Sequence, residues 1–102
     1  MEYYYAVIFT SQLSDNPEGY NEMANQMEAL ARRQPGYLGF ESARSEIGIS
    51  ISYWKDPESI AAWKTQLAHQ KAQEKGMQQW YSHYHVRICK VEREYSFNKP
   101  SL

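Results

Sequence analysis

The sequence predicts an α+β fold in which two helices pack on an antiparallel four-stranded sheet, and its periodicities support this. Residues 3–10, 37–45, 48–53 and 84–97 are predicted strands, and in 48–53 apolar residues alternate with small ones at period two. Apolar residues recur three or four positions apart, as on one side of a helix, from Tyr20 to Leu30 and within 57–75. A chain of 102 residues has room for one domain. We therefore expect a single domain over 1–102, with its core at about 3–97 and a frayed tail at 98–102.

The segment at 48–72 combines a strand, a turn and a helix, and the rest of the chain is organised around it. Ile49, Ile51 and Tyr53 alternate with small residues, which is the pattern of a strand. Asp56 suits the N-cap of the next helix and Pro57 its first position, where the missing N–H costs nothing. The helix then carries an apolar stripe of Ile60, Trp63 and Leu67.

The remaining elements complete the order β-α-β-β-α-β, which is the ferredoxin-like plan. Asn16 and Pro17 repeat the cap-then-proline pattern ahead of the first helix. The strand at 3–10 is apolar on both faces, and the apolar phase changes within 84–97. Such a change indicates a bulge, or a strand whose two halves pack against different bodies. A second copy of the chain would supply the second body.

Composition excludes several classes of function. Charged residues make up 23% of the chain and the net charge is −1, so no basic field favours nucleic acid. The single cysteine, Cys89, allows no internal disulfide and fits a reducing compartment, and neither a signal peptide nor a membrane span is visible. We expect a cytoplasmic protein. Nine tyrosines and three tryptophans predict an aromatic-lined cavity, an aromatic interface or an aromatic core.

Several short motifs together resemble the antibiotic biosynthesis monooxygenase (ABM) domain family of the dimeric α/β-barrel superfamily. They are Gln-Pro-Gly-Tyr-Leu-Gly at 34–39, Glu41-Ser42, Ser52-Tyr53-Trp54, Trp63, His69, Trp80-Tyr81 and Val91-Glu92-Arg93. The resemblance implies a homodimer whose sheets pair face to face, with a small-molecule cavity between sheet and helices. It also implies either cofactor-independent oxygenation of polycyclic aromatic substrates or oxygenative haem breakdown.

The haem-degrading branch of that family carries an Asn on the first strand, a Trp on the second helix and a His ten residues after this Trp. Trp63 matches the Trp, but Gln73 stands ten residues later and the strand at 3–10 has no Asn. We therefore expect no haem degradation of that type.

Candidate site residues follow from the resemblance and from side-chain chemistry. We expect His69, Trp63 and Arg44 as catalytic candidates, and Tyr5, Tyr53, Trp54 and Trp63 as the lining of the substrate cavity. Arg44 can hold an anionic substrate or a developing enolate charge, and His69 can transfer a proton. The alternative for Trp63 is core packing, for Arg44 the sheet surface, and for His69 solvent. Cys89 is expected to be buried, and His83 and His85 share a face without a third ligand, so no metal is expected.

The function that these observations favour is a cofactor-independent monooxygenase acting on a small aromatic or quinol-type substrate in a sheet–helix cavity. No cofactor is expected, because an electron-rich substrate reacts with O₂ once it is deprotonated. The alternatives are a non-catalytic dimeric module that binds a small molecule or haem, and a purely structural protein. The absence of an unmistakable base among the cavity candidates keeps the binding module open.

Overall fold

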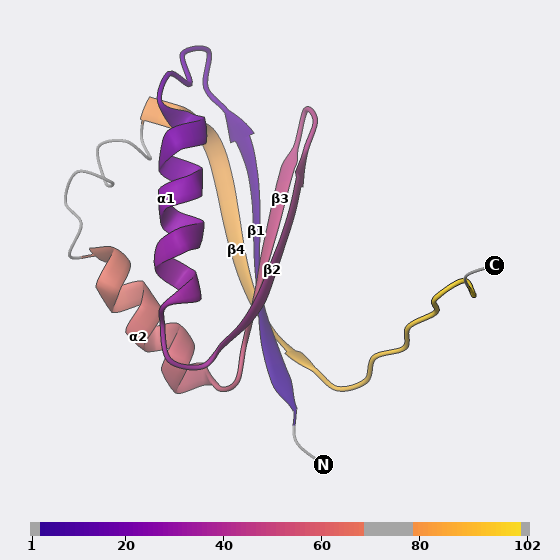
Figure 1. Ribbon diagram of the computed structural model, residues 1–102. Coiled ribbons are helices and arrows are strands. Elements are labelled where there is room, and N and C mark those ends of the chain that lie inside the picture. Colours follow the sequence, from indigo (N-terminus) through magenta and orange to yellow (C-terminus); the bar gives the residue numbers. More distant parts are fainter. Residues whose placement is uncertain (1–2, 69–78, 101–102) are drawn as a thin grey trace.

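The computed structural model describes residues 3–68 and 79–100 and has the predicted β-α-β-β-α-β order (Figure 1). Its elements are β1 (Tyr4–Leu13), α1 (Tyr20–Arg32), β2 (Tyr37–Arg44), β3 (Gly48–Trp54), α2 (Pro57–Ala68) and β4 (Tyr81–Val91). The strands form one antiparallel sheet in the order β2-β3-β1-β4. Both helices lie on the same side of this sheet (Figure 1), which confirms the ferredoxin-like plan.

The pairing registers divide the sheet residues between a helix face, which the helices cover, and an open face on the other side. On β1, Tyr5 and Val7 pack against the core, and their β3 partners are Trp54 and Ser52. Side chains alternate along a strand. The intervening residues of β1 and their partners on β3 and β4 therefore belong to the open face: Tyr4, Ala6, Ile8, Ile51, Tyr53, Arg87, Cys89 and Val91.

The core lies between α2 and the middle of the sheet. Its buried members are Ala31, Trp54, Ile60 and Trp63, with Tyr5, Val7, Leu30, Tyr37 and Leu67 packed around them. The rings of Trp54 and Trp63 stack with their centroids 5.9 Å apart. Trp54 is fully buried, and its indole N–H donates to Ser52 Oγ at 2.8 Å, so its polar atom is satisfied.

The two helices begin differently. Asp56 Oδ1 accepts hydrogen bonds from the backbone N–H and the hydroxyl of Ser59, at 2.8 and 2.7 Å, which confirms Asp56 as the N-cap of α2. The prediction that Asn16 caps α1 is wrong. A turn follows Pro17, and α1 begins only at Tyr20 after Gly19, whose φ of 86° is left-handed and suits glycine.

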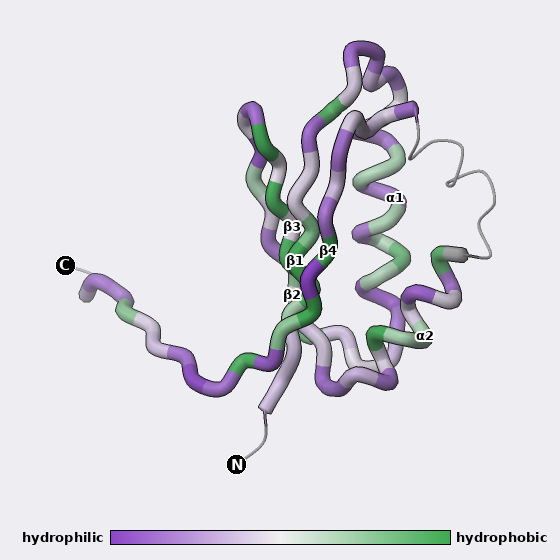
Figure 2. Tube along the Cα trace, turned by 180° about the vertical axis from the view of Figure 1, so that it is seen from behind, coloured by the Kyte–Doolittle hydropathy of each residue, from purple (hydrophilic) through white to green (hydrophobic). Residues whose placement is uncertain are grey.

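The last strand is shorter than predicted and begins earlier. It spans Tyr81–Val91 instead of 84–97, and the register shifts where Gln12 and Leu13 of β1 pair with His83 and Tyr81. Residues 92–100 leave the sheet on the side away from the helices (Figures 1 and 2). A hydrophobic stretch is still visible in this segment (Figure 2). The rings of Tyr95 and Phe97 in this segment are more than 80% exposed.

Two further features of the described residues bear on the sequence expectations. Cys89 is exposed on the open face beside Ala6, so the prediction of a buried thiol is wrong. The reason is that β4 is an edge strand, covered by neither helix on that face. No helix within 3–68 and 79–100 is long and apolar enough to cross a membrane.

Candidate functional site

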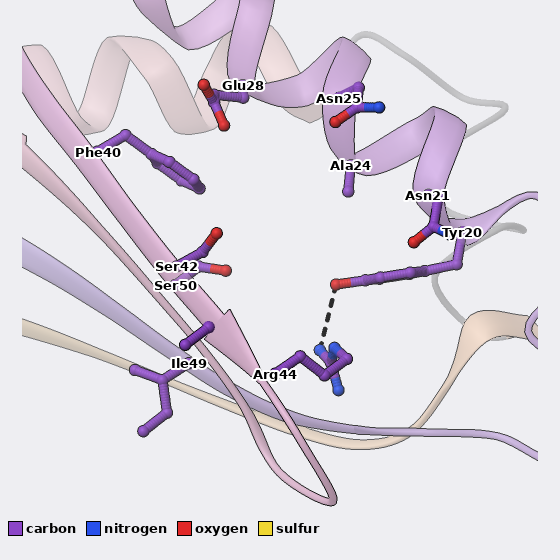
Figure 3. Close-up of a pocket in the computed structure, with 11 residues that line it drawn as sticks. Tyr20, Asn21, Ala24, Asn25, Glu28, Phe40, Ser42, Arg44, Ile49 and Ser50 are labelled. Carbon is purple, nitrogen blue, oxygen red and sulfur yellow. Dashed lines mark hydrogen bonds between the residues drawn. The ribbon is translucent and has the colours of Figure 1, made fainter.

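A cleft of about 560 Å³ lies between α1 and the hairpin formed by β2 and β3 (Figure 3). It is lined by Tyr20, Asn21, Ala24, Asn25 and Glu28 from α1 and by Phe40, Ser42, Ala43, Arg44, Ile49 and Ser50 from the hairpin. This volume falls within the range of about 300–1,000 Å³ that is typical of small-molecule sites.

The cleft has an aromatic end and a cationic end because of how the two walls repeat. Residues four and eight positions apart lie on one side of a helix, so Tyr20, Ala24 and Glu28 line one wall in sequence. Alternate residues of β2 form the other wall, from Phe40 to Arg44. Figure 3 shows Glu28 and Phe40 at one end of the cleft, and Tyr20 and Arg44 at the other.

Arg44 is half-buried and is held by three hydrogen bonds to groups outside its own strand. Its Nη1 donates to the Ser11 carbonyl oxygen at 3.4 Å, and its Nη2 donates to Ser11 Oγ and, at 3.2 Å, to the Tyr20 hydroxyl. The guanidinium carbon also lies 5.0 Å from the Tyr20 ring centroid. Ser11 itself is buried. A guanidinium carries five N–H donors, so two have no partner among the residues that the structure describes.

Gly48 makes room for this guanidinium. It pairs with Arg44 across the hairpin, and a Cβ at position 48 would lie within 3.0 Å of Cζ and both Nη atoms. A side chain at this position would therefore force Arg44 out of its place. The small residue that alternation puts on the helix face of β3 is thus part of the site.

An aromatic cluster packs against Tyr20 at the cationic end of the cleft. The Tyr20 and Tyr81 rings meet edge to face at 5.7 Å, and Tyr81 also contacts Phe9 and Tyr84. Burial, followed by the nearby Tyr20, raises the pKa of Tyr81, so its hydroxyl stays protonated at neutral pH. The cluster contains no carboxylate to compensate the charge of Arg44.

The two charged residues of the cleft differ in how they are compensated. Glu28 accepts two hydrogen bonds from Arg32 on the next turn of α1, from Nη2 at 2.6 Å and from Nε at 3.1 Å. Both bonds reach the same oxygen, Oε2, which leaves Oε1 without a partner among the described residues. Arg44, by contrast, has no carboxylate within 4.0 Å anywhere in 3–68 and 79–100.

Three of the predicted site residues come together, but they do so in the core. Tyr5, Trp54 and Trp63 belong to the hydrophobic cluster beneath α2, and none of them lines the cleft. Trp63 is 9% exposed and stacked on Trp54. This placement agrees with the alternative of core packing, and a role for these rings in binding stays a prediction.

Tyr53 does not lie with the others, which corrects the predicted lining. It follows the alternation of β3 onto the open face, where its ring meets Tyr4 edge to face at 5.9 Å. Its hydroxyl donates to Glu41 at 2.7 Å, and this hydrogen bond raises the pKa of Tyr53 to about 12. Adjacent residues of one strand point to opposite faces, so Tyr53 and Trp54 cannot line the same side of the sheet.

The other predicted candidates are placed as follows. Arg44 lines the cleft, and its role in holding an anionic substrate stays a prediction. His69 and Gln73 lie outside the described residues. His83 and His85 both lie on the open face of β4, opposite Gln12 and Thr10. No group of three potential metal ligands occurs within 3–68 and 79–100.

Sequence reasoning missed the α1 wall of the cleft, above all Asn21, Asn25 and Glu28. Their signal is weak, because polar residues on a helix usually face solvent. The spacing of Tyr20 places it in the apolar stripe of α1. Its hydroxyl accepts a hydrogen bond from Arg44, which lies 24 residues away along the chain, and no local pattern indicates this contact.

Comparison with known proteins places this architecture among monooxygenases. The family model described as "Monooxygenase af470-like" matches residues 10–91. The uncharacterized protein YqjZ of Bacillus subtilis is 47% identical over 98 residues, covering 94% of this chain and 86% of YqjZ. The jasmonate monooxygenase ABM of Pyricularia oryzae is 40% identical over 43 residues, which are 42% of this chain and 20% of that protein.

Solved structures share the fold at low sequence identity. A candidate antibiotic biosynthesis monooxygenase from Nitrosomonas europaea superposes with a TM-score of 0.72 at 19% identity, covering 87% of this chain and 90% of that one. A variant of SnoaB, a cofactor-independent oxygenase from Streptomyces nogalater, gives 0.73 at 14% identity, with 89% and 95% covered. The resemblance to the ABM domain family is thereby confirmed.

Proposed function

The chain belongs to the monooxygenase af470-like family, and on this premise we propose that it is a cofactor-independent monooxygenase. Its substrate would be a small aromatic or quinol-type compound bound in the cleft between α1 and the β2–β3 hairpin. One observation carries the proposal: a half-buried arginine, fixed by three hydrogen bonds, stands at the end of an open cleft without a protein carboxylate among the described residues. Burying an uncompensated charge is costly, so such a cation is suited to a negatively charged partner.

The chemistry requires a stabilised negative charge on the substrate. A deprotonated phenol or enol gives an electron-rich carbon that reduces O₂ directly. When a C–H₂ carbon becomes a carbonyl, one oxygen atom enters the product, the other leaves as water, and the substrate supplies all four electrons. The two N–H donors of Arg44 that have no partner among the described residues would hold the negative charge of the substrate, on a carboxylate or on the deprotonated oxygen. The Phe40 ring and Ala24 offer apolar contact for a flat ring.

Relatives support the reaction class without indicating this chain's substrate. SnoaB is named as a cofactor-independent oxygenase, and the Pyricularia protein as a jasmonate monooxygenase. The first shares only the fold at 14% identity, and the second matches less than half of this chain. Both agree with oxygenation as the activity of the family.

We further propose that the protein works as a homodimer joined through the open faces of two sheets. The support is the apolar content of that face, to which Ala6, Ile8, Ile49 and Ile51 belong, with Ile49 44% exposed. Stable interfaces of this kind bury more than about 2,000 Å² in total. The cleft lies on the helix face, so this pairing leaves it accessible to substrate.

The test is oxygen uptake by the purified protein with a panel of hydroxyanthrones and naphthohydroquinones, in the presence of a chelator and without added flavin or haem. We expect uptake that is proportional to protein concentration, with one atom of ¹⁸O from ¹⁸O₂ in each product molecule. Arg44→Gln should lower this rate at least tenfold, whereas Arg33→Gln, which changes an exposed arginine outside the cleft, should not. Uptake that equals the protein-free rate for every substrate would refute the proposal.

The second candidate is a binding module without turnover. It is favoured by the lining of the cleft, in which the carboxylate Glu28 is engaged by Arg32 and no histidine is present among the described lining residues. A saturable fluorescence response to the same compounds, with oxygen uptake at the background rate, would identify this case.

A further inference from the structure

The two ends of the cleft differ in charge and in hydrogen-bonding capacity, so the cleft can select more of a ligand than one negative charge. Among the described residues, Arg44 has donors without a partner at one end, and Glu28 has an acceptor oxygen without a partner at the other. Arg32 neutralises Glu28 through Oε2 alone. The first end therefore favours an anion, and the second favours a neutral group that donates a hydrogen bond.

The spacing of the two ends sets the length of the ligand. Tyr20, which bonds Arg44, and Glu28 are eight residues apart on one helix, which is about 12 Å along its axis. The opposite wall agrees, since Phe40 and Arg44 are four residues apart on one strand, or about 13 Å. After allowance for the side chains, two fused rings with a substituent at each end fill this distance.

The middle of the cleft suits such a ring system. Figure 3 shows the Phe40 ring and the Ala24 methyl group on opposite walls, with Ser42 and Ser50 between the two ends. Phe40 supplies a flat apolar surface, and Ala24 leaves space where a larger side chain would close the cleft. The serine hydroxyls add hydrogen-bonding groups without charge.

We infer that the substrate class of this site is a hydroxylated bicyclic aromatic acid, bound with its carboxylate on Arg44 and its hydroxyl directed to Glu28. This inference rests on the proposed function for the identity of the site, and it adds the class and the orientation of the ligand.

The same geometry discriminates against dianions. A second carboxylate in place of the hydroxyl would meet Glu28, and two like charges facing each other in a partly buried site repel. Glu28 is therefore a specificity-determining residue, and Arg44 is the residue that anchors the acid. Replacement of Glu28 by Gln removes the repulsion while keeping the acceptor oxygen.

The experiment measures dissociation constants by isothermal titration calorimetry under nitrogen, so that no turnover occurs. The probes are 6-hydroxy-2-naphthoate, 2-naphthoate, 2-naphthol and naphthalene-2,6-dicarboxylate. The wild-type protein should bind 6-hydroxy-2-naphthoate most tightly, at least tenfold better than 2-naphthol and at least tenfold better than the dicarboxylate. The affinity for 2-naphthoate should lie between those for 6-hydroxy-2-naphthoate and 2-naphthol.

Two variants assign these preferences to residues. Arg44→Gln should weaken the binding of 6-hydroxy-2-naphthoate at least tenfold and change the dissociation constant of 2-naphthol less than twofold. Arg44→Lys keeps the charge and should still bind the acid more tightly than 2-naphthol. Glu28→Gln should improve dicarboxylate binding at least fivefold. Glu58→Gln, an exposed glutamate in the first turn of α2, is the matched control and should change nothing.

Several outcomes would overturn the inference. One is a wild-type protein that binds 2-naphthol as tightly as 2-naphthoate, a comparison that needs no variant to fold. Another is an Arg44→Gln protein whose affinities for 6-hydroxy-2-naphthoate and 2-naphthol fall by the same factor. That result would indicate a change in the shape of the cleft instead of a lost charge contact. Oxygen uptake on neutral phenols without acid binding would refute the substrate class and leave the oxygenase proposal standing. Binding of the acid without ¹⁸O incorporation would refute the oxygenase proposal and leave the ligand class standing.

Discussion

Gly48→Ala should destabilise this protein, although the same change in an ordinary strand stabilises it. Alanine in a strand interior is favoured over glycine by roughly 0.5–1 kcal/mol, because glycine loses more conformational freedom on folding. At position 48, however, the added Cβ lies within 3.0 Å of the Arg44 guanidinium and displaces it. The sign of the effect therefore depends on whether Arg44 occupies the position that the structure gives it.

The magnitude follows from the hydrogen bonds that Arg44 loses. A hydrogen bond to a charged group contributes about 1.5–3 kcal/mol. Nη2 makes two such bonds, to Ser11 Oγ and to the Tyr20 hydroxyl. The lower value applies to each, because a displaced and half-exposed guanidinium regains water. Set against the gain from alanine, the net loss is about 2 kcal/mol, or a fall in Tm of roughly 8–16 °C for a domain of this size.

The assay is a double-mutant cycle measured by urea denaturation at one fixed protein concentration. Gly48→Ala alone should cost about 2 kcal/mol, whereas in an Arg44→Ala background it should be neutral or stabilising by up to about 1 kcal/mol. The coupling energy between the two positions should then be about 2–3 kcal/mol. Equal effects of Gly48→Ala in both backgrounds would refute the role assigned to Gly48.

Three further predictions concern the core and the open face. Trp63→Ala should lower the free energy of unfolding by about 3–5 kcal/mol, because it removes a buried ring stacked on Trp54; denaturation followed by circular dichroism measures the loss. Tyr53 should ionise late in an ultraviolet titration, since the Glu41 hydrogen bond raises its pKa to about 12, and Glu41→Gln should bring this pKa back toward 10.0. The folded pKa is the higher one, so the stability from this pair is complete below pH 10 and is lost as the pH rises through 12. Light scattering should give about twice the 12.0 kDa chain mass, and Ile49→Glu should reduce it toward the monomer.

Each of these predictions has a matched control. Trp63→Phe keeps an aromatic ring in the core and should lose less stability than Trp63→Ala; a Trp63→Ala loss below about 1 kcal/mol would contradict the packing. Tyr53→Phe should lower the amplitude of the late component by one tyrosine, because Tyr81, whose pKa burial also raises, still ionises late; an unchanged amplitude would contradict the assignment to Tyr53. Ile49→Val should keep the dimer mass. A wild-type monomer at micromolar concentration would disprove the homodimer.

The sequence predicted those parts of the fold that depend on local periodicity. The alternation in 48–53 and the cap at Asp56 act between neighbours in the chain, and both are observed. The predicted end of β4 was wrong because alternating apolar residues continue past Val91 without a partner strand. Alternation alone does not show where pairing ends. The placement of Tyr53 in the cavity failed for a simpler reason, since it neighbours Trp54 and must point the other way.

The candidate site was predictable only in part. Arg44 was selected for its chemistry, and the structure places it in a cleft. What makes the cleft is the meeting of α1 with the β2–β3 hairpin, and the contacts of Arg44 with Ser11 and Tyr20 join residues 33 and 24 positions apart. No spacing rule within one element reveals such contacts. Glu28 looks in sequence like any surface glutamate paired with an arginine one turn later.

The exposed thiol of Cys89 allows the covering of the open face to be followed by the rate of its chemical modification. It is the only cysteine of the chain, and it lies on that face beside Ala6. A thiol reagent can therefore modify the protein at one place only, and the rate of that reaction reports whether the face is covered. If two copies pair through their open faces, the rate constant falls as the protein concentration rises, and the concentration at half-protection is the dissociation constant of the dimer. A single native residue thus provides a measurement of self-association that needs neither a label nor a substitution.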